Sequence, residues 1–282
     1  MSNILLVDVG GTNLRYAYAE IGAKVISESK KIPLESIEQF DLTLEELMRA
    51  NDVMNLVISV AGPKIGSSIS MTNRKLVVDQ DKLKKKFNLH SCFLLNDWES
   101  IGYSLANMNQ NEIDIIKTGK TFNNNSFFIG PGTGLGAALL INNTNVLPTE
   151  IGNTTGLTKS LIKNYNLKDE SDFITLENVV SGSAISKIFE NLTGQLIKSE
   201  QVIELYKEGN NDAVNVINGF TKSLAEVMSD MALTFIAGNG VFFAGSLMRT
   251  IVELMDKELF IKHFIGNKKG THKDLLEMIP IG

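Results

Sequence analysis

Cysteine is almost absent from this chain of 282 residues, which contains only Cys92. A single cysteine excludes an intrachain disulfide framework and a cysteine-rich metal cluster, so no structural zinc is expected. It is also typical of a protein kept in a reducing compartment, which predicts the cytoplasm. Long apolar runs are missing as well, because the run that begins at Ile4 is interrupted at Asp8. That run is too short for a signal peptide or a membrane span, so no membrane partner is predicted.

The sequence also has no excess of positive charge. Lysine and arginine total 27 against 32 aspartates and glutamates, which gives a net charge of −5. This mild acidity argues against a protein that binds nucleic acid through a basic face. Hydrophobic residues make up 43% and charged residues 21%, which excludes intrinsic disorder and is typical of a soluble globular protein. The length of 282 residues predicts one large domain or two modest ones.

What the sequence does contain is a repeat of strand, glycine-rich turn and strand. The first copy surrounds the turn at Thr12, and the second surrounds the turn at Thr133. A repeat at this large spacing predicts duplicated domains rather than a solenoid. The polar, asparagine-rich segment 107–125 is the candidate boundary, so we expect a small domain over residues 1–110 and a large one over residues 111–282.

Between and after the two copies, strands and helices are expected to alternate. Ser36 and Gln39 have the spacing of a capping box, which predicts the start of a helix. The apolar periodicity of residues 212–237 predicts the longest helix. Further strands are predicted at residues 25–32, 56–60, 93–95 and 240–244, and further helices at residues 79–87, 177–190, 200–207 and from about 247.

The first glycine turn is a candidate phosphate-binding loop. Glycine lets a phosphate approach the main-chain N–H groups without a Cβ atom in the way. The main-chain N–H groups of Gly10 and Gly11 would be joined by side-chain donors from Thr12 and Asn13. Asp8 could hold a magnesium ion through water. The alternative is an ordinary hairpin turn that uses the glycines for their positive φ angles. The turn alone favours the ordinary hairpin.

A second glycine turn, formed by Gly132, Thr133 and Gly134, could serve the same purpose. A dinucleotide fingerprint would open a helix here, but an apolar strand follows, which argues against a Rossmann oxidoreductase. Two such turns that face each other across a domain cleft can hold the phosphates of one nucleotide. The turn at Gly245 and Ser246, between a strand and a helix, is a candidate surface for the adenosine.

Three carboxylates and an amide are candidates for binding a substrate or for catalysis. Asn96 and Asp97 come at the end of a buried strand, where ligands of open α/β sheets bind, and an aspartate there can act as a general base. The segment alone favours Asp97 as the N-cap of the helix that follows, a role that does not exclude that of a base. Glu150 lies in a loop and Glu177 at an expected helix start; either could bind two vicinal hydroxyls of a sugar or be an ordinary surface acid.

Taken in order, these segments resemble the bacterial glucokinase family of ATP-dependent hexose kinases. The resemblance implies the actin-like ATPase (ribonuclease H-like) fold, with two α/β domains and a cleft between them. It rests on an ordered set of motifs, each of which is weak alone. The motifs are residues 7–15, 61–63, 71–74, 95–97, 130–136, 147–150, 177–182 and 240–245.

The resemblance also implies a reaction and its residues. The γ-phosphoryl group of Mg-ATP would pass to the 6-hydroxyl of glucose, giving glucose 6-phosphate and ADP, in a protein that forms a homodimer. Asp97 would be the general base, and Asp8 would hold Mg²⁺ through water. The sugar would be bound by Asn96, Glu150, Asn153 and Glu177. ATP would be bound by Asp8, Gly10, Gly11, Thr12, Asn13, Gly132, Thr133, Gly134, Gly245 and Ser246.

Three departures from the family pattern keep alternatives open. Asn153 stands where the family usually has a histidine, and Ser246 stands where it usually has a glycine. The chain stops at Gly282, where family members continue with a further strand and helix. The alternatives are a catalytically weak sugar-binding or regulatory relative, or a kinase for another hexose or an amino sugar.

Overall fold

The computed structural model describes residues 3–282 except 35, 72–75, 106–107, 109 and 267. The chain divides into two compact units, Met1–Asn107 and Met108–Gly282. Each unit has a hydrophobic core of its own, which is what allows it to form a separate body.

The first unit is built on a five-stranded sheet of order β3-β2-β1-β4-β8. Strands β1, β2 and β3 are antiparallel neighbours, whereas β1, β4 and β8 run parallel. The predicted strand at 25–32 is shorter than expected, because regular pairing begins only at Lys30. The strands are β1 (Asn3–Val9), β2 (Asn13–Glu20), β3 (Lys30–Pro33), β4 (Asn55–Val60) and β8 (Ser91–Asn96).

Three helices and a small second sheet complete this unit. Ser36 accepts a hydrogen bond from the Gln39 N–H at 3.2 Å, which confirms the predicted helix start. The small antiparallel sheet β5-β6-β7 was not predicted, because its strands are two or three residues long and show no periodicity. The elements are α1 (Ile37–Ala50), α2 (Gln80–Lys86), α3 (Asp97–Leu105), β5 (Lys64–Ile65), β6 (Ser68–Ser70) and β7 (Val77–Asp79).

The second unit repeats the pattern of the first. Its sheet has the order β11-β10-β9-β12, in which three antiparallel strands are joined by a fourth that is parallel to β9. The predicted duplication is therefore visible in the sheets themselves. Beyond β12, the segment around Ile281 pairs with Val241. The strands are β9 (Ser126–Pro131), β10 (Leu135–Ile141), β11 (Asn145–Thr149) and β12 (Gly240–Phe243).

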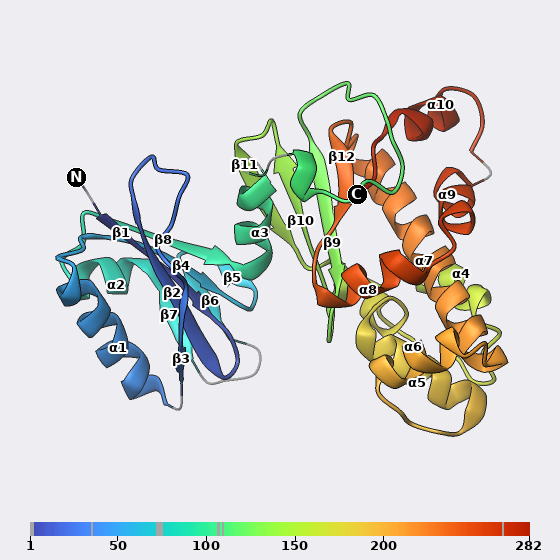
Figure 1. Cartoon of the computed structure of the whole chain (residues 1–282), viewed down its shortest axis with the longest axis horizontal. Helices are drawn as coiled ribbons and strands as arrows, with labels where there is room; N and C mark the ends of the chain where they lie inside the picture. The colour runs from blue at the N-terminus through green and yellow to red at the C-terminus, as the bar shows by residue number, and fades with distance from the viewer. Residues whose placement is uncertain (1–2, 35, 72–75, 106–107, 109, 267) are drawn as a thin grey trace. The chain divides into compact units, whose positions relative to one another are not determined.

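Helices make up the rest of the second unit, and α7 is the longest of them (Figure 1). It packs on β9 and β12 and contacts α5, α6 and α9. No helix among the described residues is both long enough and apolar enough to cross a membrane. The helices are α4 (Thr158–Leu161), α5 (Gly182–Thr193), α6 (Ser199–Lys207), α7 (Asn211–Phe235), α8 (Ser246–Leu254), α9 (Lys257–Ile265) and α10 (Thr271–Met278). The short 3-10 turns are η1 (Gln110–Glu112), η2 (Ile151–Asn153), η3 (Ile162–Asn164) and η4 (Leu176–Asn178).

One predicted helix is wrong at its start. Residues 177–190 were expected to be helical, but Glu177 lies in η4 and α5 begins only at Gly182. The reason is local, because the Asn178 Oδ1 accepts hydrogen bonds from both the N–H and the hydroxyl of Thr175. That closed turn ends before Ser181, which caps α5 by accepting a hydrogen bond from the Ala184 N–H at 2.9 Å.

Candidate active site

The end of β8 holds the predicted catalytic segment in a capping box. The Asn96 Oδ1 accepts hydrogen bonds from the N–H groups of Trp98 at 2.8 Å and Glu99 at 3.1 Å. In return, the Glu99 Oε2 accepts a hydrogen bond from the Asn96 N–H at 3.2 Å. Asn96 is therefore the N-cap, and the prediction that Asp97 could fill that role is wrong. Asp97 is the first residue of α3 and is half-buried.

Further contacts fix this segment to the neighbouring loop. The Asn96 Nδ2 donates to the Gly62 carbonyl at 3.0 Å, which is the one hydrogen bond it donates among the described residues. The Lys64 ammonium lies 3.1 Å from the Glu99 carboxylate, whose side chain is only 9% exposed. Sequence reasoning missed Glu99 and Lys64, although the spacing of Asn96 and Glu99 is a capping-box signal.

The first glycine turn lies at the same edge of the sheet as Asp97. Strands β1, β4 and β8 end level with one another, since Val9 is the register partner of Val60 and Val60 is that of Asn96. Two strand spacings place the start of the turn about 10 Å from Asp97.

The glycines of this turn are not required by backbone conformation. Neither Gly10 nor Gly11 is among the residues with positive φ, which argues against the ordinary hairpin explanation. A Cβ atom on Gly11 would meet nothing within 4 Å, so there is open space on that side of the turn. The Gly10 N–H donates to the Asn13 carbonyl, and the Asn13 Nδ2 donates to the Thr12 hydroxyl at 2.6 Å.

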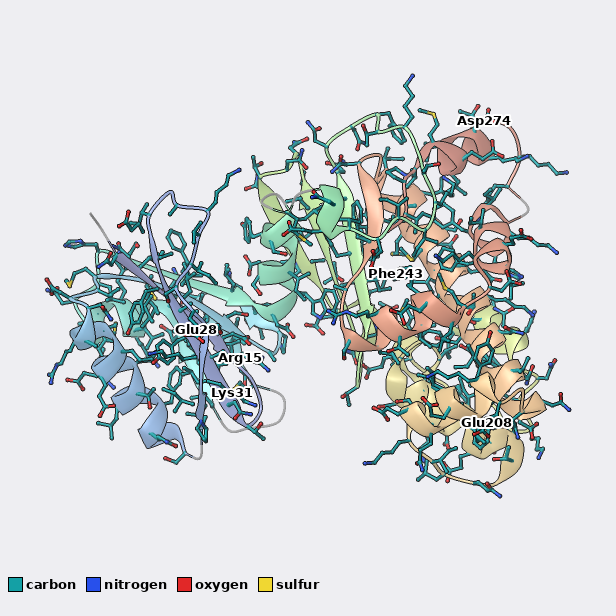
Figure 2. All side chains as sticks on the ribbon, in the orientation of Figure 1. Arg15, Glu28, Lys31, Glu208, Phe243 and Asp274 are labelled. Carbon is teal, nitrogen blue, oxygen red and sulfur yellow. The ribbon has the colours of Figure 1, made fainter. Side chains whose placement is uncertain are left out.

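Asp8 is placed where a carboxylate could meet a hydrated magnesium ion. It is half-exposed, and its Oδ2 lies 3.1 Å from the Arg15 guanidinium. Arg15 is in turn the register partner of Lys31 on β3, so two cations stand beside the turn (Figure 2). The described residues contain no cluster of three metal-ligating side chains. One carboxylate nevertheless fits Mg²⁺, which commonly keeps its waters and takes its other ligands from substrate phosphates.

In the second unit, two helix N-termini meet the turn at Gly132. The Gly182 N–H, at the start of α5, donates to the Gly132 carbonyl at 2.7 Å. The start of α8 lies beside it, since a Cβ atom on Gly182 would be 3.2 Å from the Leu247 side chain. Gly245, with a φ of 106°, precedes α8, and both Gly245 and Ser246 are exposed. Helix N-termini favour anions, so this corner of the unit suits phosphate.

Thr133 is exposed at the tip of this turn. Among the described residues, neither its N–H nor its hydroxyl has a hydrogen-bond partner. The Gly132 N–H is already used within the turn, where it donates to the Gly134 carbonyl at 2.8 Å. A ligand that binds this turn would therefore be held chiefly by Thr133.

The three predicted sugar-binding residues of the second unit come together. Glu150 precedes η2 and Asn153 is its last residue, and the Asn153 Nδ2 donates to the Glu150 Oε2 at 3.4 Å. Glu177 reaches the same loop, because its Oε2 is 3.4 Å from where a Cβ atom on Gly152 would stand. The Leu176 N–H donates to the Thr154 carbonyl, which ties η4 to η2. The arrangement offers carboxylate and amide oxygens to hydroxyl donors.

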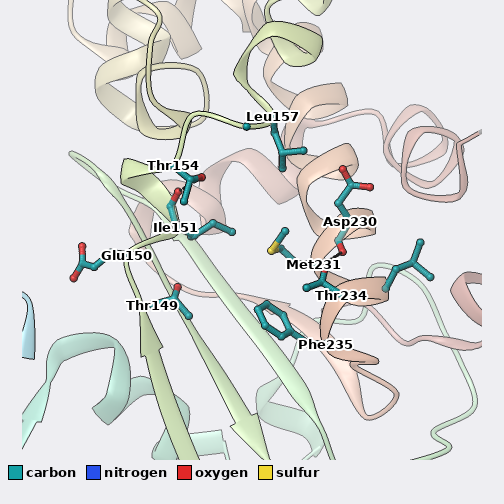
Figure 3. A pocket seen from close by; sticks show the side chains of 11 residues that line it. Thr149, Glu150, Ile151, Thr154, Leu157, Asp230, Met231, Thr234 and Phe235 are labelled. Carbon is teal, nitrogen blue, oxygen red and sulfur yellow. Dashed lines mark hydrogen bonds between the residues drawn. The ribbon is translucent and has the colours of Figure 1, made fainter.

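A hollow of about 830 Å³ opens behind this loop, between η2 and the end of α7. Its walls are largely apolar, with Ile151, Met231 and Phe235 among the lining residues. In Figure 3 the Glu150 carboxylate points away from Met231 and Phe235. Because a hexose needs hydrogen-bonding partners for its hydroxyls, this hollow does not suit the sugar.

The chain matches a known family and known relatives along its whole length. It matches the sequence profile of the family described as Glucokinase over residues 5–282. The glucokinases of Colwellia psychrerythraea and Campylobacter jejuni subsp. doylei are each 27% identical to it, and each alignment covers 98% of this chain. The alignments cover 90% and 88% of those relatives. The motif residues Thr72, Asn73 and Arg74 lie outside the described part of the structure.

Solved structures resemble this chain in fold. A glucokinase from an Antarctic psychrotroph superposes with a TM-score of 0.79 at 25% identity, covering 100% of this chain and 94% of that one. A ROK family glucokinase from Streptomyces griseus, in complex with glucose and AMPPNP, has a TM-score of 0.64 at 16% identity and covers 98% of both chains. The predicted actin-like ATPase fold with two domains is confirmed.

Proposed function

The chain belongs to the glucokinase family, and we propose that the residues described above carry out the reaction of an ATP-dependent hexose kinase. That reaction transfers the γ-phosphoryl group of ATP to the 6-hydroxyl of glucose. The assignment of residues rests on one observation: Asp97 and the first glycine turn lie at the same edge of the sheet, where β1, β4 and β8 end. A base and a phosphate-binding turn are needed at one place for this reaction.

Asp97 is the general base in this proposal. Its carboxylate accepts the proton of the 6-hydroxyl as the oxygen attacks the terminal phosphorus. The capping box of Asn96 and Glu99 holds its backbone in place, and positioning is the main source of catalysis in phosphoryl transfer. The remaining Nδ2 hydrogen of Asn96 donates to another sugar hydroxyl.

The other sugar hydroxyls bind to the second unit. Glu150 and Glu177 accept hydrogen bonds from them, and each carboxylate can bind two neighbouring hydroxyls. Asn153 contributes its amide, which lies next to Glu150. Asn153 is shorter than the histidine usual in the family and carries no ring charge, so we expect it to influence which hexose is preferred.

The two glycine turns hold the nucleotide. Thr12 and Thr133 bind phosphate oxygens, and there is space for a ligand where a Cβ atom on Gly11 or Gly132 would stand. Gly245 and Ser246 receive the adenosine. Mg²⁺, when bound through water to Asp8, neutralises charge on the phosphates. Arg15 forms an exposed ion pair with Asp8. Such surface pairs stabilise a protein by at most about 1 kcal/mol, so this pair can open when Asp8 binds the hydrated ion.

The cellular location and the assembly are separate proposals. A cytoplasmic location is supported by the single buried cysteine, which needs no oxidising compartment. A homodimer is proposed from the family resemblance alone. Light scattering of the purified protein tests the dimer, and a mass of one chain contradicts it.

The test of the proposed function is a coupled assay with purified protein, Mg-ATP and a panel of hexoses. We expect ADP release with glucose, and the panel of mannose, glucosamine and N-acetylated amino sugars measures the preference set by Asn153. If no hexose raises ADP release above background while calorimetry detects glucose binding, the chain is a sugar-binding relative. If neither is detected, the proposed function is wrong.

A further inference from the structure

The carboxylate of Glu177 rests directly against two glycines from different loops. A Cβ atom built on Gly134, in the turn between β9 and β10, would lie 2.7 Å from the Glu177 Oε2. A Cβ atom on Gly152, in η2, would lie 3.4 Å from the same oxygen. Any side chain at position 134 would therefore occupy the space that this carboxylate now fills.

The backbone that carries Glu177 has little freedom to retreat. Leu176 and Val179, on either side of it, are fully buried. The Leu176 N–H is bonded to the Thr154 carbonyl, and the buried Tyr165 hydroxyl donates to the Val179 carbonyl at 2.8 Å. A methyl group on Gly134 would consequently move the carboxylate by rotating its side chain, because the main chain is fixed at both ends.

We propose that Gly134 is a positioning residue for the acceptor sugar, because the absence of its side chain leaves the Glu177 carboxylate room to lie against η2. The inference rests on the proposed function, in which Glu177 binds sugar hydroxyls. It gives Gly134, which belongs to a nucleotide-binding turn, a role on the sugar side of the reaction. The two substrates would then be recognised by two residues of one turn, Thr133 for ATP and Gly134 for the sugar.

Gly134 is suited to a clean substitution. It has no positive φ, so alanine meets no backbone strain there. The atoms that its methyl group would meet within 4 Å are both at the far end of the Glu177 side chain. Gly152 is unsuitable, because its methyl group would lie 2.5 Å from the Leu135 carbonyl oxygen and would disturb the main chain.

The test compares Gly134→Ala with Gly132→Ala, two identical changes in one turn. A methyl group on Gly132 would meet no protein atom within 4 Å, and Gly132 belongs to the proposed phosphate-binding turn. We expect Gly134→Ala to raise the KM for the hexose by about tenfold or more, as for loss of a hydrogen bond to a charged group, with the KM for ATP nearly unchanged. We expect Gly132→Ala to affect the KM for ATP instead.

A double-mutant cycle with Glu177→Asp shows whether the effect passes through the carboxylate. Aspartate is one methylene shorter, which withdraws its carboxylate from the methyl group at position 134. Added to Glu177→Asp, the change Gly134→Ala should therefore raise the hexose KM by no more than about twofold. This double variant also supplies the measurement if Gly134→Ala alone does not fold.

The outcomes separate the inference from the proposed function. If the wild type phosphorylates a hexose but Gly134→Ala raises only the KM for ATP, the inference is wrong and the proposed function stands. The same holds if the effects of Gly134→Ala and Glu177→Asp multiply fully. If the wild type neither binds nor phosphorylates any hexose of the panel, both are wrong. A crystal structure of Gly134→Ala with Glu177 in its present position also overturns the inference.

Discussion

Replacing Asn96 by alanine should destabilise the first unit, because this residue joins three structural elements. Its Oδ1 accepts hydrogen bonds from the N–H groups of Trp98 and Glu99, and its Nδ2 donates to the Gly62 carbonyl. The side chain is buried, since Asn96 is only 5% exposed. Water therefore has little access to the groups that alanine would leave without a partner.

The expected loss of stability is the sum over the groups that Asn96→Ala leaves without a hydrogen-bond partner. The Trp98 N–H keeps a partner, because the Asp97 Oδ1 also accepts from it at 3.0 Å. The Glu99 N–H is buried and loses its acceptor, which costs about 1–3 kcal/mol. The lost hydrogen bond to Gly62 adds roughly 1 kcal/mol. Asn96→Ala should thus lower the free energy of unfolding by about 2–4 kcal/mol.

The chain supplies its own probe for this measurement. Trp98 is the single tryptophan and lies two residues from the substitution. Urea unfolding followed by its fluorescence therefore reports the unit that contains α3, whatever the second unit does. The free energy of unfolding is obtained from the midpoint and the slope of that transition.

Two control variants make the expectation specific. Asn96→Ser keeps an oxygen that can cap α3 and loses the bond to Gly62, so its cost should be about 0.5–1.5 kcal/mol. Asn51→Ala removes an exposed asparagine of the same unit whose side chain has no hydrogen bond among the described residues, and should change stability by less than about 0.5 kcal/mol. If Asn96→Ala is no more costly than Asn51→Ala, the capping argument is refuted.

Three further predictions concern other parts of the chain. Asn142 and Asn143 have φ angles of 53° and 57° in the turn between β10 and β11. A β-branched residue is strained at such an angle, so Asn143→Val should lower the free energy of unfolding by about 1–2 kcal/mol, whereas Asn143→Gly should not lower it. Equal melting temperatures of the two variants would contradict this. Gly62 has a φ of 142°, and a Cβ atom there would clash with the Ser70 carbonyl oxygen. Gly62→Ala should therefore lower the free energy of unfolding in urea by about 2–5 kcal/mol. An unfolding midpoint equal to that of the wild type would disprove this prediction. Burial raises the pKa of the Cys92 thiol to about 11. A thiol reagent at pH 8 should therefore label the native protein far more slowly than the urea-unfolded protein. Equal labelling rates would contradict the burial of this thiol.

The repeat and the fold could be predicted because their signals are local. Each glycine turn interrupts an apolar strand, and in both units the structure shows three antiparallel strands followed by parallel ones, β4 and β8 in the first unit and β12 in the second. The strand at residues 240–244 was also predictable from its apolar run. The two- and three-residue strands β5, β6 and β7 were not, because pairs this short have no periodicity to detect.

The details of the site depended on contacts that the sequence does not reveal. Asn96 and Asp97 both favour N-cap positions, and only the return hydrogen bond from Glu99 decides between them. The start of α5 was predicted five residues too early, because the closed turn of Thr175 and Asn178 resembles a helix start in sequence. The contact between Glu177 and Gly134 joins segments far apart in the chain, so no sequence pattern could indicate it.

The proposed role of Asp97 is tested most directly by the turnover of Asp97→Asn. The amide has nearly the same shape as the carboxylate and still offers an oxygen to the Trp98 N–H, so the fluorescence-detected unfolding transition should stay near that of the wild type. With glucose and Mg-ATP, we expect kcat to fall by at least about 100-fold, with little change in the KM for either substrate. A kcat within about tenfold of the wild-type value would contradict the assignment of Asp97 as the general base.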